Sequence, residues 1–317
     1  MAGRHSTGST AKDFLGENRW KKMFGRSMGQ ALLLLVGCVI WQCAFAALSV
    51  DFQDLDLLST SGLQALEASL LQHKVVIIKG AASIDVEELR RITRFFGELH
   101  VHLESSSHFP GYSDVNVVSN IRNNETGQIN GLYGVHVESY HSDLSWAELP
   151  TKYTLLKSVV RSANCGDTHF INTNDAYDDL STELKVRLNG LQGNYCYLKT
   201  RNLDFEVGLT AEEVAQAQNC AVHPIITTHP ITGRKNIYAN PSHTSNVIGL
   251  SAEESDALLQ TLFTHSQQDK YLYAHKWSDD DLIIWDNRSL WHRGTGCPED
   301  QPRMLIRTTV LNDVRPV

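Results

Sequence analysis

His141 and Asp143 lie two residues apart in the segment SYHSDLSW, residues 139–146, and both side chains are of types that bind metal ions. In a β-strand, residues i and i+2 project from the same face, whereas on a helix they diverge by about 200°. A strand or a strand edge is therefore the regular geometry in which this pair binds one ion together. Two protein ligands hold a metal poorly, so we expect a third ligand from elsewhere in the chain.

The best candidate for the third ligand is His292, in the segment WDNRSLWHRGTG, which follows an apolar run and precedes a glycine-containing turn. Two histidines and one carboxylate on one face of an octahedron form the facial triad of non-haem Fe(II) oxygenases, and they leave three positions open for cosubstrate and oxygen. Each residue alone is weak evidence, because short motifs often occur by chance and most histidines are ordinary core or surface residues.

Two arginines follow His292 in the next β-rich run, RMLIRTTVL. Arg303 and Arg307 are an even number of residues apart, so both can project to the same side of a strand. A guanidinium offers a planar fork that matches a carboxylate, as a dicarboxylate cosubstrate requires. A surface ion pair for each arginine is the alternative, but it does not explain why both fall inside an apolar run.

The elements that must position these residues are mostly strands. The chain has 317 residues, of which 42% are hydrophobic, and from residue 50 onward it shows no repeat, low-complexity linker or hinge. We therefore expect one domain over residues 50–317. Short β-rich runs recur at residues 74–80, 114–120, 152–161, 220–229, 281–286 and 303–311. This pattern predicts a mainly β fold, with a sandwich or barrel-like core and flanking helices.

Helices are expected at a few places only. Apolar residues recur near helical spacing after Thr60 and after Asp85. Capping boxes at residues 210–213 (TAEE) and 251–254 (SAEE) predict two more helix starts, because the hydroxyl and the glutamate satisfy the first free amides. The glycine motifs that bind phosphates, G-x-G-x-x-G and G-x-x-x-x-G-K-[ST], do not occur in the sequence.

Several segments, taken in order, resemble the TauD/TfdA family of taurine and 2,4-dichlorophenoxyacetate dioxygenases. The similarity runs from about residue 63 to residue 311 and includes LLQHKVVIIKG, RFFGELHVH, YHSDLSW, CGDTHFINTNDAYDDLS, THPITGRKNIYAN and WDNRSLWHRGT, followed by PRMLIRTTVL. The resemblance implies a double-stranded β-helix core, also called a jelly-roll or cupin-like core. It also implies an oxidoreductase that uses Fe(II), 2-oxoglutarate and O₂, hydroxylates its substrate, and releases succinate and CO₂.

The same resemblance assigns roles to individual residues. It places the metal ligands at His141, Asp143 and His292, and it implies no catalytic group beyond this metal centre. It places 2-oxoglutarate on Thr168, in a Gly-Asp-Thr turn, and on Arg303. The guanidinium of Arg303 would therefore bind a carboxylate of 2-oxoglutarate, in agreement with the dicarboxylate expected from the two arginines.

For the substrate, the resemblance points to Arg307, which often meets an acidic group in the family, and to His102, which can line the same pocket. We therefore expect a small, anionic organic acid as the partner. Val137 stands where a taurine-specific enzyme carries an asparagine, so taurine itself is not the expected substrate. Two other hypotheses remain open, a zinc-dependent hydrolase and a non-catalytic binding protein on the same fold.

Net charge and histidine placement argue against other classes of ligand. The formal net charge is −8 and the 28 basic residues are scattered, so nucleic acid is not an expected partner. His100, His102 and His108 form a loose cluster, but we do not expect a second metal there.

The first 49 residues form an N-terminal leader with a hydrophobic segment. Residues 27–50 carry no charge and follow several basic residues, which is long enough for a membrane span. A signal anchor through residues 28–50, or a signal peptide cleaved after the A-x-A-like residues 44–46, would send the domain to the membrane or the secretory pathway. The sequon at residues 124–126 would then be usable. A core strand or an extension that is never inserted, with a cytoplasmic domain, is the alternative.

Six cysteines are present, with no C-x-x-C pair: Cys38, Cys43, Cys165, Cys196, Cys220 and Cys297. We expect most of these cysteines to be free thiols, and one disulfide is compatible with their pattern. Cys165 precedes the Gly-Asp-Thr turn, and we expect it to be a packed small hydrophobic residue rather than a nucleophile.

Overall fold

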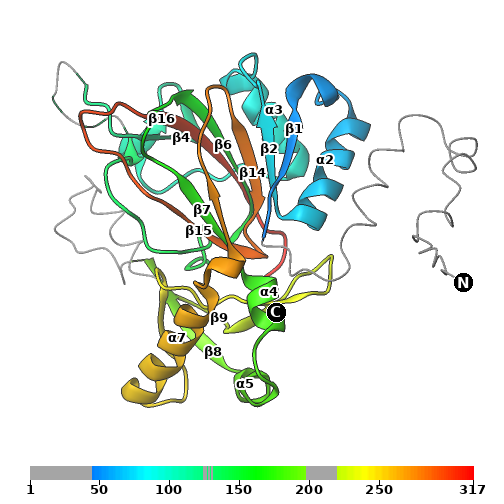
Figure 1. Cartoon of the computed structure of the whole chain (residues 1–317), viewed down its shortest axis with the longest axis vertical. Helices are drawn as coiled ribbons and strands as arrows, with labels where there is room; N and C mark the ends of the chain where they lie inside the picture. The colour runs from blue at the N-terminus through cyan, green and yellow to red at the C-terminus, as the bar shows by residue number, and fades with distance from the viewer. Residues whose placement is uncertain (1–44, 124–126, 128, 130, 198–219) are drawn as a thin grey trace, which may run out of the picture. The chain divides into compact units, whose positions relative to one another are not determined.

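The computed structural model describes residues 45–123, 127, 129, 131–197 and 220–317 of the chain. These residues belong to one compact unit that extends to Val317. Their arrangement is mainly β, with helices packed on the outside (Figure 1). The expected jelly-roll core with flanking helices is confirmed.

The largest sheet has the strand order β1-β2-β14-β6-β16-β4-β3, and β5 also pairs with β4. β1 pairs with β2, and β4 with β5, in parallel, while the other neighbours are antiparallel. Five of these strands coincide with predicted runs. The bounds are β1 Leu48–Asp51, β2 Val75–Lys79, β3 His108–Phe109, β4 Tyr112–Ser119, β5 Leu132–Tyr133, β6 Thr151–Val160, β14 Leu282–Asp286 and β16 Met304–Leu311.

Three smaller sheets complete the described strands. Their orders are β13-β7-β15, β12-β8-β9 and β10-β11. The run 220–229, predicted as one strand, is divided into β9 and β10 after Pro224, which has no backbone N–H to donate to a ladder. The bounds are β7 Thr168–Asn172, β8 Gln192–Cys196, β9 Cys220–Pro224, β10 Ile226–Thr228, β11 Lys235–Ile237, β12 Thr244–Val247, β13 Leu272–His275 and β15 Leu290–Gly294.

Two N-terminal helices cover one face of the large sheet, and Figure 1 shows them beside β1 and β2. They are α2 (Thr60–His73) and α3 (Val86–Phe96), and their N-caps Ser59 and Asp85 accept hydrogen bonds from the first turn. The capping box predicted at residues 251–254 opens α7 (Ala252–Ser266), whereas the one predicted at 210–213 lies outside the described residues. The other helical segments are α4 Thr173–Asp178, α5 Thr182–Leu188, η1 Phe52–Asp54, η2 Ser105–Ser107 and η4 Asp269–Tyr271.

Strand β14 shows how the large sheet is buried on both faces. Leu282 and Ile284 pack into the apolar cluster formed with α2 and α3. Ile283 and Trp285 point the other way, into a cluster that includes Phe170 of β7 and residues of β15. Because successive strand residues alternate between faces, a strand covered on both sides reads as a continuous apolar run, as the DLIIWD segment does.

The beginning of the domain differs from the expectation. Phe45 is buried and packs edge-on against Tyr273, and β1 pairs with β2 in the large sheet. The folded unit thus starts a few residues before the boundary expected at residue 50, and residues 48–50 of the hydrophobic segment are part of β1. Cleavage after Ala46 would remove Phe45 from this core. Within the described chain, which excludes residues 1–44, no helix is long and apolar enough to cross a membrane.

The prediction of mostly free thiols is wrong for four cysteines. Cys165 is bonded to Cys297 and Cys196 to Cys220, so Cys165 is not a packed free thiol. The second pair stands directly opposite in the β8–β9 ladder, and the first joins segments 132 residues apart. Both pairings follow from strand register and topology, which cysteine spacing does not reveal. The remaining two cysteines lie outside the described residues.

Candidate metal centre

A single backbone bridge brings the two candidate histidines together. The N–H of His141 donates to the carbonyl of His292 at 3.0 Å, and the N–H of His292 donates back to His141 at 2.8 Å. His292 lies on β15, whereas His141 forms an isolated antiparallel bridge and Asp143 begins the turn that follows. The predicted strand-edge geometry is therefore observed, although residues 139–143 form no regular strand.

The side chains of His141, Asp143 and His292 converge on one point. The Nε2 atoms of the two histidines are each 3.7 Å from Oδ1 of Asp143. One possible ligand atom from each residue lies within 4.8 Å of the other two, and within the described part of the chain no other group of three His, Cys, Asp or Glu residues is so arranged.

The protonation states of these residues fit a divalent cation. The Nδ1 atom of His141 lies 2.9 Å from the carbonyl of Ser139, which can only accept, so Nδ1 carries the proton and Nε2 keeps its lone pair. Burial lowers the pKa of His292 to about 3, which keeps its imidazole neutral. Burial alone would raise the pKa of Asp143, but the guanidinium of Arg307 and the hydrogen bond from Thr154 hold it below its usual value. Two neutral imidazoles and one carboxylate are the donor set of a facial triad.

The residues predicted to bind 2-oxoglutarate are also buried near this point. Thr168 is the first residue of β7, and its hydroxyl accepts a hydrogen bond from Nε1 of Trp277 at 3.1 Å. Arg303 is 4% exposed and lies immediately before β16, not inside the strand as predicted. Its side chain packs against Gly166, whose φ is +80°, and a Cβ at that position would be 2.4 Å from the Arg303 Cδ. The glycine of the Gly-Asp-Thr turn therefore makes room for the arginine.

One small cavity collects these groups. Its lining includes His141, His292, Thr168, Arg303, Arg307 and Glu138. Both arginines thus line one cavity, although Arg303 precedes β16 and does not project from the strand as expected. The cavity has a volume of about 30 Å³.

Glu138 is a cavity residue that sequence reasoning missed. Its carboxylate accepts the backbone N–H of Gly294 at 2.8 Å, beside the second histidine ligand. Its position three residues before His141 was the only signal in the sequence. Trp277, Thr154 and Asn287 were missed as well, because their contacts with Thr168 and Asp143 join distant strands.

The two residues predicted to bind substrate lie together beside Asp143. Nη1 of Arg307 is 3.6 Å from Oδ1 of Asp143, and Nη2 is 3.4 Å from Nδ1 of His102. The other ring nitrogen of His102 is 3.1 Å from the hydroxyl of Thr309. Burial and the adjacent guanidinium lower the pKa of His102, so the ring is neutral. Val137, by contrast, is 62% exposed and does not face the cavity.

A second, larger cavity lies on the His102 side. It has a volume of about 490 Å³ and is lined by His100, Leu103, Trp146 and Glu148 among others. The rings of His100 and His102 pack edge-on with centroids 4.9 Å apart, which links this cavity to the Arg307 side of the metal centre.

A jelly-roll core that presents two histidines and a carboxylate beside a buried arginine defines an oxygenase of the facial-triad class. Comparison with known proteins specifies it further. The model of the taurine catabolism dioxygenase TauD, TfdA family matches residues 40–309. The chain therefore belongs to this family, and it is an Fe(II)- and 2-oxoglutarate-dependent dioxygenase.

Individual relatives are similar over most of their length. An alpha-ketoglutarate-dependent 2,4-dichlorophenoxyacetate dioxygenase of Burkholderia sp. (strain RASC) is 29% identical over 80% of this chain and 87% of that protein. An alpha-ketoglutarate-dependent sulfate ester dioxygenase of Pseudomonas putida is 27% identical over 81% and 83%, respectively. Among solved structures, AAD-2 in complex with Mn(II) and N-oxalylglycine has a TM-score of 0.68 at 27% identity, covering 85% of this chain and 96% of that one. A taurine dioxygenase from Burkholderia xenovorans has a TM-score of 0.69 at 25% identity, covering 86% and 89%.

Proposed function

We propose that this dioxygenase hydroxylates a small, anionic organic substrate and converts 2-oxoglutarate to succinate and CO₂ in the same cycle. The observation that carries the proposal is that His141, His292, Arg303 and Arg307 line one cavity, with Asp143 completing the triad beside the two histidines. A zinc-dependent hydrolase would give Arg303 and Thr168 no role, and a non-catalytic binding protein would have no need of all three ligands.

In this proposal His141, Asp143 and His292 would hold Fe(II). When bound, Fe(II) would activate O₂ in a reaction coupled to the oxidative decarboxylation of 2-oxoglutarate. Arg303 binds the distal carboxylate of 2-oxoglutarate. Its fork is desolvated, so a charge-assisted pair there is stronger than at the surface. Thr168 adds a hydroxyl, and because the indole of Trp277 already donates to that oxygen, the hydroxyl proton is free to point elsewhere.

The substrate end selects for negative charge. Arg307 supplies a fixed cation within 3.6 Å of the metal ligand Asp143, and the neutral His102 beside it can donate or accept without adding charge. The cavity of about 490 Å³ beyond His102, with Trp146 in its wall, would take the organic body of the substrate. Relatives named for 2,4-dichlorophenoxyacetate, sulfonates and sulfate esters act on organic anions, which supports this class.

A substrate panel tests the proposal. The full chain would be incubated aerobically with Fe(II), 2-oxoglutarate and aryloxyacetates, alkylsulfonates or alkyl sulfate esters, each paired with a neutral analogue of the same shape. We expect succinate formation to rise with at least one anion and to stay at its basal rate with the matched neutral compound. Equal stimulation by neutral analogues would refute selection for negative charge.

We further propose that the domain works in an oxidising compartment, delivered by residues 1–44 acting as a signal or anchor. The two disulfides support this, since such bonds persist in secretory compartments and are rare in the cytosol. The charge-free residues 27–44 and the sequon at 124–126 are compatible with it. Thiol labelling of the protein isolated from cells would test the idea. Four alkylatable thiols at these positions in the native protein would favour the cytoplasmic alternative.

A further inference from the structure

The carboxylate of Asp143 is held by a closed set of hydrogen bonds that none of the proposed roles uses. The Thr154 hydroxyl lies 2.6 Å from Oδ2 of Asp143, and Nδ2 of Asn287 donates to the same hydroxyl at 2.9 Å. The backbone N–H of Asp143 completes the ring by donating to Oδ1 of Asn287 at 3.2 Å. Thr154 and Asn287 are 0% and 2% exposed, so water does not compete for these bonds.

The direction of each bond in this ring is fixed by chemistry. A threonine hydroxyl has one proton, and the Asn287 amide already donates to its oxygen, so the proton must go to Asp143. Nε1 of Trp285 donates to Oδ1 of Asn287 at 3.1 Å, and an indole can only donate, so the amide cannot be reversed. Oδ2 of Asp143 is therefore engaged, whereas Oδ1 faces the two histidine Nε2 atoms at 3.7 Å.

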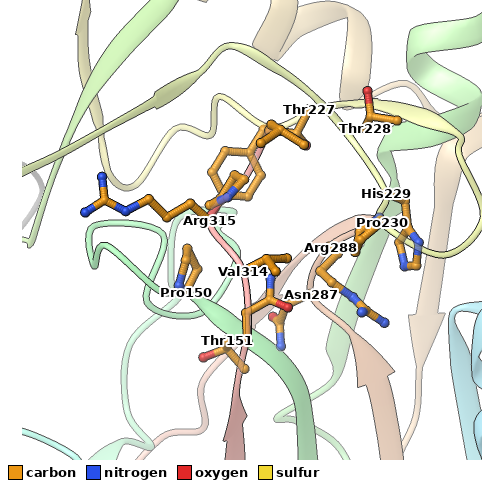
Figure 2. Close-up of a pocket in the computed structure, with 14 residues that line it drawn as sticks. Pro150, Thr151, Thr227, Thr228, His229, Pro230, Asn287, Arg288, Val314 and Arg315 are labelled. Atoms are coloured by element: carbon orange, nitrogen blue, oxygen red, sulfur yellow. The ribbon is translucent and has the colours of Figure 1, made fainter.

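The turn that carries Asn287 is itself anchored. The guanidinium of Arg288 donates to both oxygens of Asp286, at 2.8 and 2.6 Å, and His229 contacts the same carboxylate at 3.0 Å. Figure 2 shows Asn287 and Arg288 along a second small cavity, with Thr151 and His229 also on its wall. Because its neighbours in the turn are buried and paired, Asn287 presents its amide to Thr154 from a rigid support.

We propose that Thr154 and Asn287 are positioning residues that keep Asp143 a monodentate ligand. A metal ion held by the triad would need its remaining coordination positions for 2-oxoglutarate and O₂. If Oδ2 were released, a carboxylate could bind through both oxygens and occupy one of those positions. The inference rests on the proposed function, and it predicts that the ring protects cosubstrate binding more than metal binding.

The test is anaerobic titration of the full chain with 2-oxoglutarate at saturating Fe(II), followed by the visible absorbance that a chelating 2-oxo acid gives on ferrous iron. Thr154→Val removes the hydroxyl at nearly constant shape, and we expect it to weaken 2-oxoglutarate binding about ten-fold or more, the size of other outer-shell effects. Thr154→Ser keeps the hydroxyl and should restore affinity to within about three-fold of the original.

Two further variants show whether a loss of 2-oxoglutarate affinity is specific to this set of hydrogen bonds. Asn287→Asp replaces the amide donor with a carboxylate oxygen that competes with Asp143 for the Thr154 proton. It should weaken 2-oxoglutarate binding in the same direction, which keeps the test valid if Thr154→Val does not fold. Thr308→Val is the matched control, because Thr308 is a buried threonine on the neighbouring β16 whose hydroxyl contacts Thr93, away from the metal centre. It should bind 2-oxoglutarate like the original chain.

The outcomes separate this inference from the proposed function. Failure of the unmodified chain to give the absorbance would overturn the proposed function itself. A normal signal with Thr154→Val and Asn287→Asp both binding 2-oxoglutarate as tightly as the unmodified chain would overturn only the positioning role. Binding of Mn(II), measured by calorimetry on the same variants, should change less than the affinity for 2-oxoglutarate. A larger loss for Mn(II) would likewise contradict the proposal.

Discussion

The metal end and the substrate end of the centre are built differently. At the metal end, His141 and His292 are joined through their backbones, and Asp143 has its carboxylate tied to Thr154. At the substrate end, Arg307 and His102 meet only through side chains, at 3.4 Å, beside a cavity of about 490 Å³. A rigid backbone bridge suits chemistry shared by the whole family, whereas side chains around an open space suit a substrate that changes from one member to the next.

The largest effect should come from breaking the metal end. Asp143→Ala removes the only carboxylate among the three ligands, so we expect loss of Fe(II) binding and of all 2-oxoglutarate turnover, with or without substrate. Metal content after dialysis and succinate formation would be measured together. Asp114→Ala, which breaks a half-buried pair with Arg90, is the control and should retain both. An Asp143→Ala protein that still forms succinate would contradict the assignment of the triad.

Substitution of Arg303 and substitution of Arg307 should affect the binding of different ligands. Arg303→Lys keeps the charge but loses the fork, so we expect the KM for 2-oxoglutarate to rise about 10- to 100-fold, as for loss of one charged hydrogen bond. Arg307→Lys should instead raise the KM for the organic anion by a similar factor.

Steady-state kinetics with each compound varied in turn would check this division. For Arg307→Lys, decarboxylation of 2-oxoglutarate without substrate should continue. An equal change in the KM for 2-oxoglutarate and the KM for the organic anion, in either variant, would contradict the assignment of the two arginines to different ligands.

The disulfides offer a smaller, matched comparison. Cys297 and Gly166 lie beside the Arg303 side chain, so the Cys165–Cys297 bond joins the two loops that present Thr168 and Arg303. The bond between Cys196 and Cys220 joins β8 to β9, and Cys220 lines the larger cavity. Replacing either pair with serine should reduce the free energy of unfolding by about 2–4 kcal/mol. Only the Cys165–Cys297 replacement should also weaken 2-oxoglutarate binding.

Denaturant unfolding and cosubstrate titration on both double-serine proteins would check this. An equal loss of 2-oxoglutarate affinity in the two proteins would show that the effect is general destabilisation.

The smallest effect concerns pH. Burial and Arg307 lower the pKa of His100 to about 4 and also lower that of His102, so both rings stay neutral well below the ordinary histidine range. Among the described residues around His102 and the larger cavity, the positive charge at the substrate end then comes from Arg307. We expect the KM for an anionic substrate to change less than about two-fold between pH 6 and 8. A KM that falls as the pH drops through about 6.5, the ordinary histidine value, would show that a protonated histidine helps to bind the anion.

The sequence was most informative where spacing along a strand fixes direction. The offset of two between His141 and Asp143 and of four between the arginines predicted which side chains share a space, and the apolar runs predicted the central strands. Thr168 and His102 were found only through the family resemblance, since a threonine after a turn and a buried histidine have no distinctive pattern alone.

What the sequence did not reveal depends on contacts between distant segments. Thr154 lies within an apolar β6 run, and its hydroxyl gains a role only because Asp143 and Asn287 approach it from two other segments. The cysteine pairs arise in the same way from strand register. Residues 48–50 were counted with the hydrophobic segment because they continue its charge-free run up to Asp51, whereas in the structure they belong to β1, which pairs in parallel with β2.

The central claim is that the triad supports oxygen-dependent turnover of 2-oxoglutarate. The most direct test measures succinate formed by the full chain, stripped of metal and reloaded with Fe(II) or Zn(II), with and without O₂. We expect succinate only with Fe(II) and O₂ together, and none after His292→Ala. Turnover of a hydrolysable substrate with Zn(II) in the absence of O₂, with no succinate under any condition, would contradict the account.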